Sequence, residues 1–357
     1  MRTIRDFVIE GKRVLIRSSL NVPLGENGSI EDDFRLRQSI PTIQYAIEKR
    51  ARCILIGHLG RPEENQKQKI ENKKLSLRKV GERLEELLGK RVMFLDDWGG
   101  ERVQEAVRAM KPGEVMLLEN LRFLKGEKEN DDDFARSLAG LGDIFVNDAF
   151  DACHRAHASI AGIPSFLPSG AGFLLEREIK ILSEIREHPQ KPMVVIVGGT
   201  KVETKADFLD EMSVRADTIL TGNPVYEEIV QKGLSFRGSE KIIGPVDGIP
   251  QQKGALDIGP RTIALFQEKM RGANTVFWAG PLGKIEEEQY TIGSLAIAKT
   301  ILKSKAFSVA GGGDLVAFLG EYGLRDQFDH VSTGGGAMLA FLAGEKLPGL
   351  EALHGNL

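Results

Sequence analysis

Arginine, histidine and asparagine side chains follow four β-branched segments in the first half of the sequence, or begin the helix expected after the first of these segments. These residues are Asn21, Arg35, Arg37, His58, Arg61, Arg122, His154, Arg155 and His157. The carboxyl ends of parallel strands meet at one edge of a sheet, where open α/β sheets bind ligands. A guanidinium group holds phosphate or carboxylate through two parallel hydrogen bonds. The first half therefore predicts a site for a small anion with several oxygens.

The same region offers other chemistries that are weaker. His154 and His157 have the i, i+3 spacing of a metal pair, but no acid or cysteine accompanies them at metal-ligand spacing. Cys153 beside His154 suggests a thiol nucleophile, yet adjacent residues rarely face each other, so a buried cysteine is favoured. One isolated arginine would be read as a solvated surface charge. The coincidence at several strand ends favours the anion site.

Glycines, rather than basic residues, follow the corresponding segments of the second half. The clusters are Gly198-Gly199, Gly222, Gly280-Pro281-Leu282-Gly283, Gly311-Gly312-Gly313 and Gly334-Gly335-Gly336. Glycine lets backbone N–H groups approach phosphate oxygens closely, and a helix that begins behind such a loop adds a favourable dipole. The second half therefore predicts a nucleotide site.

Charged residues among these glycines have chemical uses. We expect Lys201 and Lys205 on one face of a helix that begins after Gly199, within reach of transferring phosphate oxygens. Asp314 is placed to hold a Mg²⁺ ion that bridges phosphates, with a helix cap as the alternative role. The sequence lacks the P-loop and protein-kinase motifs, which excludes those two classes. No G-x-G-x-x-G follows a strand, which disfavours dinucleotide-dependent dehydrogenases.

Length and composition limit the remaining possibilities. A chain of 357 residues exceeds what one hydrophobic core usually fills, so two domains are expected. The 48 Lys+Arg nearly balance the 51 Asp+Glu, which gives no overall attraction to nucleic acid or to an anionic membrane. There is no signal-peptide-like segment and no apolar run long enough to span a membrane. With two cysteines expected to be reduced, the cytoplasm is the expected location.

Short β-branched segments alternate with amphipathic ones, which predicts an α/β fold of parallel sheets. The strand-like segments are 13–17, 51–57, 114–120 and 143–148, then 193–198, 217–222, 274–280, 306–312 and 329–335. Helical patterns cover 36–49 and 75–88. Residues 173–188 read as a linker helix between domains, with a crossover helix inside one domain as the alternative. We expect domains at 1–172 and 189–345, with a tail at about 346–357 returning to the first.

The chain resembles the phosphoglycerate kinase family over essentially its whole length. The matching segments are RSSLNVP (17–23), DDFRLRQSIPTI (32–43), GHLGRP (57–62), LLENLRFLKGE (117–127), VNDAF and HRAHAS (146–159), GGTKVETK (198–205), LDIGP (256–260), AGPLGKIE (279–286), GGGD (311–314), STGGGA (332–337) and the terminal LPGLEAL. The resemblance implies two doubly wound, Rossmann-like domains joined by a hinge helix. It also implies a monomer that transfers a phosphoryl group from 1,3-bisphosphoglycerate to ADP with Mg²⁺, giving 3-phosphoglycerate and ATP in glycolysis.

The resemblance also assigns roles to residues. The phosphoglycerate site would comprise Ser19, Asn21, Arg35, His58, Arg61, Arg122 and Arg155. The nucleotide site would comprise Gly199, Lys201, Lys205, Gly222, Pro281, Glu286, Gly311, Gly312, Gly313 and Asp314, with Asp314 as the magnesium ligand and Glu286 on the ribose. Arg35, Lys201 and the backbone of Gly312 and Gly335 would stabilise the phosphoryl group in flight.

Several positions depart from the family pattern. Ser19 replaces an aspartate that contacts the substrate hydroxyl, and Ala279 replaces an asparagine near the nucleotide. The segment 221–224 replaces a glycine-rich stretch beside the adenine, 233–254 is shorter than expected, and Asp151 brings an acid near the basic residues. Two alternatives therefore stay open beside an active kinase. One is a family member that binds its ligands without turnover, and the other is a kinase for a different small phosphorylated acid.

Overall fold

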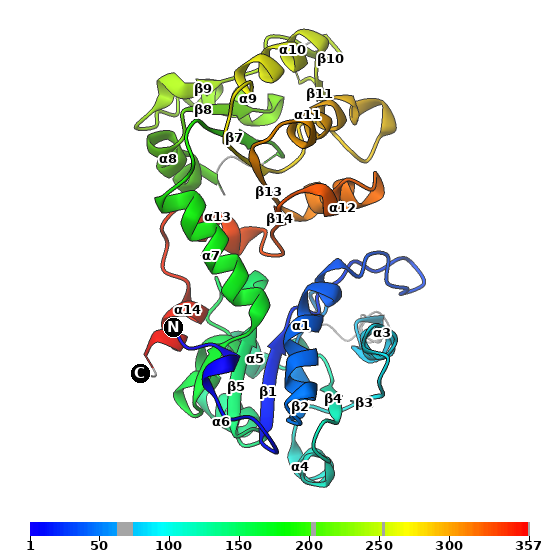
Figure 1. Ribbon diagram of the computed structural model, residues 1–357. Helices are drawn as coiled ribbons and strands as arrows, with labels where there is room; N and C mark the ends of the chain where they lie inside the picture. The colour runs from blue at the N-terminus through cyan, green and yellow to red at the C-terminus, as the bar shows by residue number, and fades with distance from the viewer. Residues whose placement is uncertain (63–73, 201–204, 252–253, 356–357) are drawn as a thin grey trace. The chain divides into compact units, whose positions relative to one another are not determined.

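The computed structural model describes residues 1–62, 74–200, 205–251 and 254–355 (Figure 1). The chain divides into two compact units, Met1–Glu178 with Lys346–Leu357 (unit 1) and Ile179–Glu345 (unit 2). The division falls within helix α7 (Phe173–Glu187), which occupies nearly all of the range predicted as a linker helix. A hinge function for α7 stays a prediction.

Unit 1 contains a six-stranded sheet in the order β3-β4-β2-β1-β5-β6, with every neighbouring pair parallel. The strands are β1 (Arg13–Ser18), β2 (Arg52–Ile56), β3 (Val92–Leu95), β4 (Val115–Leu118), β5 (Ile144–Asp148) and β6 (Ser169–Ala171). The central strand β1 pairs with β2 and β5, so that Val14 lies opposite both Cys53 and Ile144. Strands β1, β2, β4 and β5 match predicted segments, and the short β3 and β6 were not predicted.

Helices cover both faces of this sheet. They are α1 (Phe34–Glu48), α3 (Arg78–Leu88), α4 (Gly100–Ala109), α5 (Lys125–Glu129) and α6 (Asp132–Ala139). Val14 and Ile16 of β1 pack in one buried cluster with α1 and α3, whereas Leu15 packs in another with α4 and α6. Both faces of the sheet are therefore buried, as parallel sheets require. Near the C-terminus, α14 (Pro348–His354) packs on the short helix η5 (Ala158–Gly162) of the same unit.

Unit 2 repeats this plan with a six-stranded parallel sheet in the order β14-β13-β12-β7-β8-β9. The strands are β7 (Met193–Val197), β8 (Thr218–Thr221), β9 (Ile242–Ile243), β12 (Thr275–Ala279), β13 (Phe307–Gly311) and β14 (His330–Val331), with an antiparallel pair β10 (Gly248–Ile249) and β11 (Asp257–Ile258). The helices are α8 (Ala206–Arg215), α9 (Asn223–Lys232), α10 (Pro260–Lys269), α11 (Ile292–Lys303), α12 (Gly313–Glu321) and α13 (Gly336–Leu342).

In both sheets the chain begins at a central strand, winds to one side and then continues on the other. The predicted α/β class with two doubly wound parallel sheets is confirmed. No helix in the described ranges is long and apolar enough to cross a membrane.

The start of the helix expected after Gly199 falls on residues 201–204, which lie outside the described residues. The described α-helix α8 begins at Ala206, with Lys205 at its N-cap. Gly199 has a φ of +81°, which is a loop conformation. The glycines thus mark the end of β7.

Truncation of the central strand of unit 2 should destabilise that unit. Phe277 is fully buried on β12 and its ring centroid lies 5.7 Å from that of Phe208. We expect Phe277→Ala to lower the free energy of unfolding by about 3–5 kcal/mol. Urea unfolding followed by Trp278 fluorescence in a Trp98→Phe background measures this, because the two tryptophans lie in different units. The control Val230→Ala, at a side chain that is 62% exposed, should stay within about 0.5 kcal/mol of the parent.

Candidate active site

The basic residues of the first half lie at the carboxyl edge of the unit 1 sheet. Asn21 follows β1, His58 and Arg61 follow β2, Arg122 lies in the short helix η3 (Leu121–Phe123) after β4, and Arg155 follows β5. These four strands are parallel, so their carboxyl ends lie along one edge. Arg35 approaches from the first turn of α1.

The backbone of Gly60 connects several of these residues. Its N–H donates to Asn21 Oδ1 at 2.8 Å, and its carbonyl accepts from Arg122 Nη1 at 2.9 Å. Arg35 Nη1 donates to the carbonyl of Asn21 at 2.5 Å. Three predicted substrate-binding residues are therefore linked through one loop. Arg61, in the same loop, is exposed and lies close enough to Arg155 to lower its pKa, after burial of Arg155 itself.

Arg17 belongs to the same group but was not predicted. It is 1% exposed on β1, and its guanidinium contacts His58 Nδ1 at 2.6 Å and donates to Ser159 Oγ at 2.9 Å. Ser159 in turn donates to Glu127, whose side chain is fully buried. An arginine has only donors, so His58 Nδ1 accepts and the ring carries its proton on Nε2. The sequence signal that could have identified Arg17 is its charge inside a strand that is otherwise mainly apolar.

We call the group of Arg17, His58, Arg61, Arg122, Arg155 and His157 the basic cluster of unit 1. Burial and mutual repulsion shift the pKa values of several of its members. Burial, followed by the charge of Arg17 and Arg122, holds the pKa of His58 well below its usual range. Burial and the charge of Arg122 lower the pKa of His157 to about 4. Burial lowers the pKa of Arg122 to about 10, with Arg155 and Arg17 adding to the effect. An anion bound here would relieve this repulsion, while both histidines remain neutral at neutral pH.

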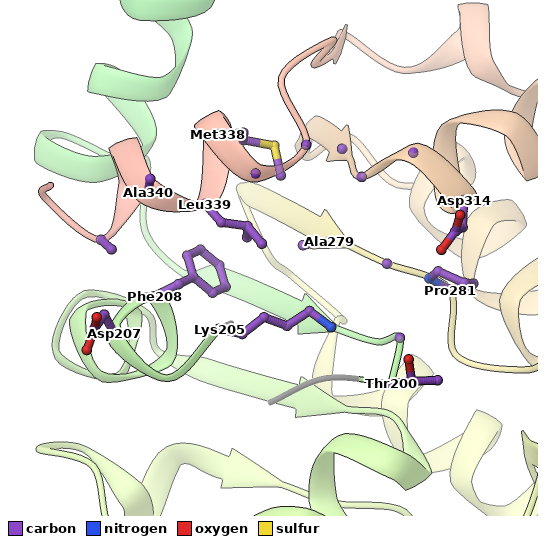
Figure 2. A pocket seen from close by; sticks show the side chains of 18 of the residues that line it. Thr200, Lys205, Asp207, Phe208, Ala279, Pro281, Asp314, Met338, Leu339 and Ala340 are labelled. Carbon is purple, nitrogen blue, oxygen red and sulfur yellow. The ribbon is translucent and has the colours of Figure 1, made fainter. Parts of the chain in front are cut away.

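A cavity of about 510 Å³ lies at the carboxyl ends of β7, β12 and β13 in unit 2 (Figure 2). Its lining includes Gly199, Thr200, Lys205, Asp207, Phe208, Ala279, Gly280, Pro281, Gly311, Gly312, Gly313, Asp314, Gly335, Gly336, Met338 and Leu339. Strands β7 and β12 are neighbours at which the winding of the sheet reverses, which is where open α/β sheets bind ligands. Phe208, Met338 and Leu339 form an apolar wall that the glycine pattern did not reveal.

Glycine is required in these loops by their geometry. A Cβ on Gly198 would lie 2.0 Å from the carbonyl oxygen of Pro281, so the loops after β7 and β12 pack backbone against backbone. Gly312, with a φ of +103°, caps the N-terminus of α12. Gly312, Gly313 and Asp314 at this helix terminus line the cavity. The N–H groups of a helix N-terminus favour an anion.

Lys205 and Asp314 are the charged residues of the predicted set that line this cavity (Figure 2). Lys205 Nζ donates to the carbonyl of Gly198 at 2.7 Å, and burial lowers its pKa while Asp314 opposes the shift. Asp314 is exposed in the first turn of α12. Across the described residues, no group of three acids, histidines or cysteines could hold a metal alone. One carboxylate beside a glycine-rich loop has the chemistry to hold a Mg²⁺ ion whose other ligands are mainly phosphate oxygens.

Two predicted nucleotide-site residues, Gly222 and Glu286, are not among the described residues that line this cavity. Gly222 caps the N-terminus of α9, and Glu286 is exposed in the loop after β12. Lys201 lies outside the described residues. The roles assigned to these three residues stay predictions.

The neutral state of His157 should make stability depend on pH. Its folded pKa of about 4 lies below the unfolded value of about 6.5, so the unfolded chain binds more protons between these values. Stability is then fully present above about pH 6.5 and is lost as the pH falls toward 4. We expect His157→Gln to reduce the loss of unfolding free energy between pH 7 and pH 5 by about 2 kcal/mol in urea titrations. The control His354→Gln, at an exposed histidine ending α14, should leave that loss unchanged.

Comparisons with known proteins agree on one family. A family model described as phosphoglycerate kinase matches residues 4–230 and 225–345. The phosphoglycerate kinase of Pseudothermotoga lettingae is 40% identical over 393 aligned residues, covering 98% of each chain. That of Thermosipho africanus is 41% identical, covering 98% of this chain and 97% of the relative.

Solved structures give the same result. The structure of phosphoglycerate kinase from Coxiella burnetii has a TM-score of 0.82 at 36% identity and covers 99% of each chain. The crystal structure of phosphoglycerate kinase from Pyrococcus horikoshii has a TM-score of 0.88 at 31% identity and covers 100% of each chain. The resemblance inferred from the motifs is confirmed: this chain belongs to the phosphoglycerate kinase family.

Proposed function

We propose that this protein is a phosphoglycerate kinase that transfers a phosphoryl group reversibly from 1,3-bisphosphoglycerate to ADP, giving 3-phosphoglycerate and ATP in glycolysis. One observation carries the proposal. In a chain of this family, Lys205, Asp314 and the backbone of three glycine-rich loops line a single cavity of a size suited to a small ligand. The cytoplasm is the proposed location, and a monomer is the proposed state.

The proposed phosphoglycerate site is the basic cluster of unit 1. Arg61, Arg122 and Arg155 would hold the phosphate, since the guanidinium fork matches its oxygens. His58 would donate a hydrogen bond from Nε2, because Arg17 occupies Nδ1. Asn21 is held by the N–H of Gly60 and supports this loop.

The transfer itself needs no proton movement. A terminal phosphate oxygen of ADP is already anionic, and it forms the new bond to phosphorus. The bond between this phosphorus and the acyl oxygen breaks, and its electrons leave with the carboxylate of 3-phosphoglycerate, which is a stable anion. The neutral histidines, with pKa values below their usual range, suit a site that binds charge without acting as a base.

The residues of this chain contribute positioning and charge stabilisation. Backbone N–H groups at Gly312 and Gly335 would bind the oxygens of the transferring group, together with Lys201 and Arg35. Lys205 would hold the nucleotide phosphates and Asp314 a Mg²⁺ ion, which when bound neutralises phosphate charge. Gly199, Gly222, Pro281, Gly311, Gly313 and Glu286 complete the proposed nucleotide site.

A coupled assay with 3-phosphoglycerate and Mg-ATP tests the activity directly. We expect turnover by the parent protein and a kcat roughly 100- to 1000-fold lower for Lys201→Ala, because the variant lacks a cation at the transferring phosphate. The control Lys299→Ala removes an exposed lysine of α11 and should leave kcat unchanged. Parent turnover no greater than that of Lys201→Ala would contradict the proposed activity. Repeating the assay with GTP in place of ATP measures the nucleotide-base preference of the enzyme, which the altered segment 221–224 is expected to affect.

The magnesium role of Asp314 predicts a specific kinetic change. Asp314→Asn should raise the Mg²⁺ concentration required for half-maximal rate by about tenfold or more, because the ion loses a carboxylate ligand. The KM for 3-phosphoglycerate should change little. Glu321→Gln, at the exposed far end of the same helix, is the matched control. An unchanged Mg²⁺ titration for Asp314→Asn would remove Asp314 from the proposed metal site.

A further inference from the structure

One carboxylate in the basic cluster of unit 1 has an oxygen without a protein partner. Asp151 lies in the short helix η4 (Phe150–Ala152) after β5, and its Oδ1 accepts from Ser19 Oγ at 2.8 Å. Within the described residues its Oδ2 accepts no hydrogen bond, and it is not among the buried side-chain atoms that lack a partner. This oxygen is therefore open to solvent. Glu127 differs, because both of its oxygens accept from Ser159.

Asp151 also interacts electrostatically with the arginines of the basic cluster. Its charge raises the pKa of Arg17, Arg122 and Arg155, each of which burial lowers. A carboxylate in this position opposes the binding of an anion. Because this carboxylate weakens the binding of an anion, its presence here indicates that the ligand also carries a hydrogen-bond donor, from which the carboxylate accepts.

The chemistry of the proposed substrate supplies such a group. The phosphate and the carboxylate of phosphoglycerate only accept hydrogen bonds near neutral pH, so their partners are the cations. The hydroxyl on C2 is the substrate's one donor, and a carboxylate is the strongest acceptor that a protein can present to it. Asp151 Oδ2 is an open carboxylate oxygen beside the arginines.

Ser19 holds this carboxylate in place. Ser19 is fully buried directly after β1, and the pairing of Ser18 with Asp148 brings the ends of β1 and β5 side by side. The Ser19 hydroxyl donates to Oδ1, which leaves Oδ2 for a ligand. Ser19 is thereby a positioning residue.

We propose that Asp151 binds the C2 hydroxyl of the phosphoglycerate and that Ser19 orients it for this contact. The inference rests on the proposed function, because it takes phosphoglycerate as the ligand. Asp151 then determines specificity for a 2-hydroxy acid over the same phosphorylated acid without the hydroxyl.

The test compares 3-phosphoglycerate with its analogue lacking the C2 hydroxyl, 3-phosphooxypropanoate. For the parent protein we expect kcat/KM to be roughly 10- to 100-fold higher with 3-phosphoglycerate, as for one hydrogen bond to a charged group. Asp151→Ala should reduce this ratio to within about threefold of one. The charge effect of the substitution acts on both substrates alike and cancels in the ratio. Ser19→Ala should reduce the ratio by a smaller factor, because the carboxylate remains but is less well oriented.

The controls separate the contact from general electrostatics and from misfolding. Glu105→Ala removes an exposed acid on α4 and should leave the ratio at the parent value. If Asp151→Ala does not fold, Asp151→Asn keeps the side-chain volume and should still lower the ratio, because a neutral amide oxygen accepts more weakly. A ratio that stays at the parent value in both Asp151 variants would overturn the proposal and leave Asp151 as a charge-balancing residue.

Failure of the proposed function is recognisable separately. If the parent protein does not turn over 3-phosphoglycerate, calorimetric Kd values for the same two compounds replace kcat/KM in the comparison. A parent Kd ratio that collapses in Asp151→Ala supports the contact without catalysis. Equal Kd values of the two compounds for the parent protein would contradict the contact.

Discussion

Positive charge concentrated at the carboxyl edge of the unit 1 sheet is the constraint on which the rest of that unit depends. Arg17 is 1% exposed and cannot lose its proton, so the fold must supply partners for it. Ser159 and the carbonyl of Ser18 accept two of its hydrogen bonds, and Glu127 places a fully buried carboxylate behind Ser159. Removing one partner of a buried charge costs far more than an exposed pair contributes. The helices after β4 and β5 are therefore as much a part of the proposed anion site as the arginines.

The proposed nucleotide site of unit 2 has different electrostatics. Glycines of the loops after β7, β12 and β13 line its cavity, and Lys205 is the one cation among the described lining residues. This arrangement requires loops that approach closely, which is why Gly198 touches the carbonyl of Pro281. Backbone N–H groups carry only partial charge, so they need no buried counter-ion. The proposed oxyanion sites of the two units thus combine the same sheet topology with different electrostatics.

The sequence predicted the central strands of both sheets because buried parallel strands are apolar runs bounded by glycine and polar residues. It missed β3, β6 and β9, which are edge strands that pair with a neighbour on one side only. The residues that would contact ligands could be proposed because they directly follow those strands. Glu127 could not be singled out, because it lies among other charged residues of 125–133 and only its packing on η5 buries it.

The contact between Ser19 and Asp151 is a second feature that the sequence alone could not predict. When each sequence segment is considered alone, Ser19 stands where the family has a carboxylate. Asp151, in another segment, adds a carboxylate for which the basic cluster shows no evident need. The two residues are 132 positions apart, and they meet only because β1 and β5 are neighbours in the sheet. Acceptor chemistry that one segment loses can thus be supplied by another whenever both strands end at the same edge. The number of charges at a site is therefore a property of the sheet edge as a whole, and a departure within one motif says little until its spatial neighbour is known.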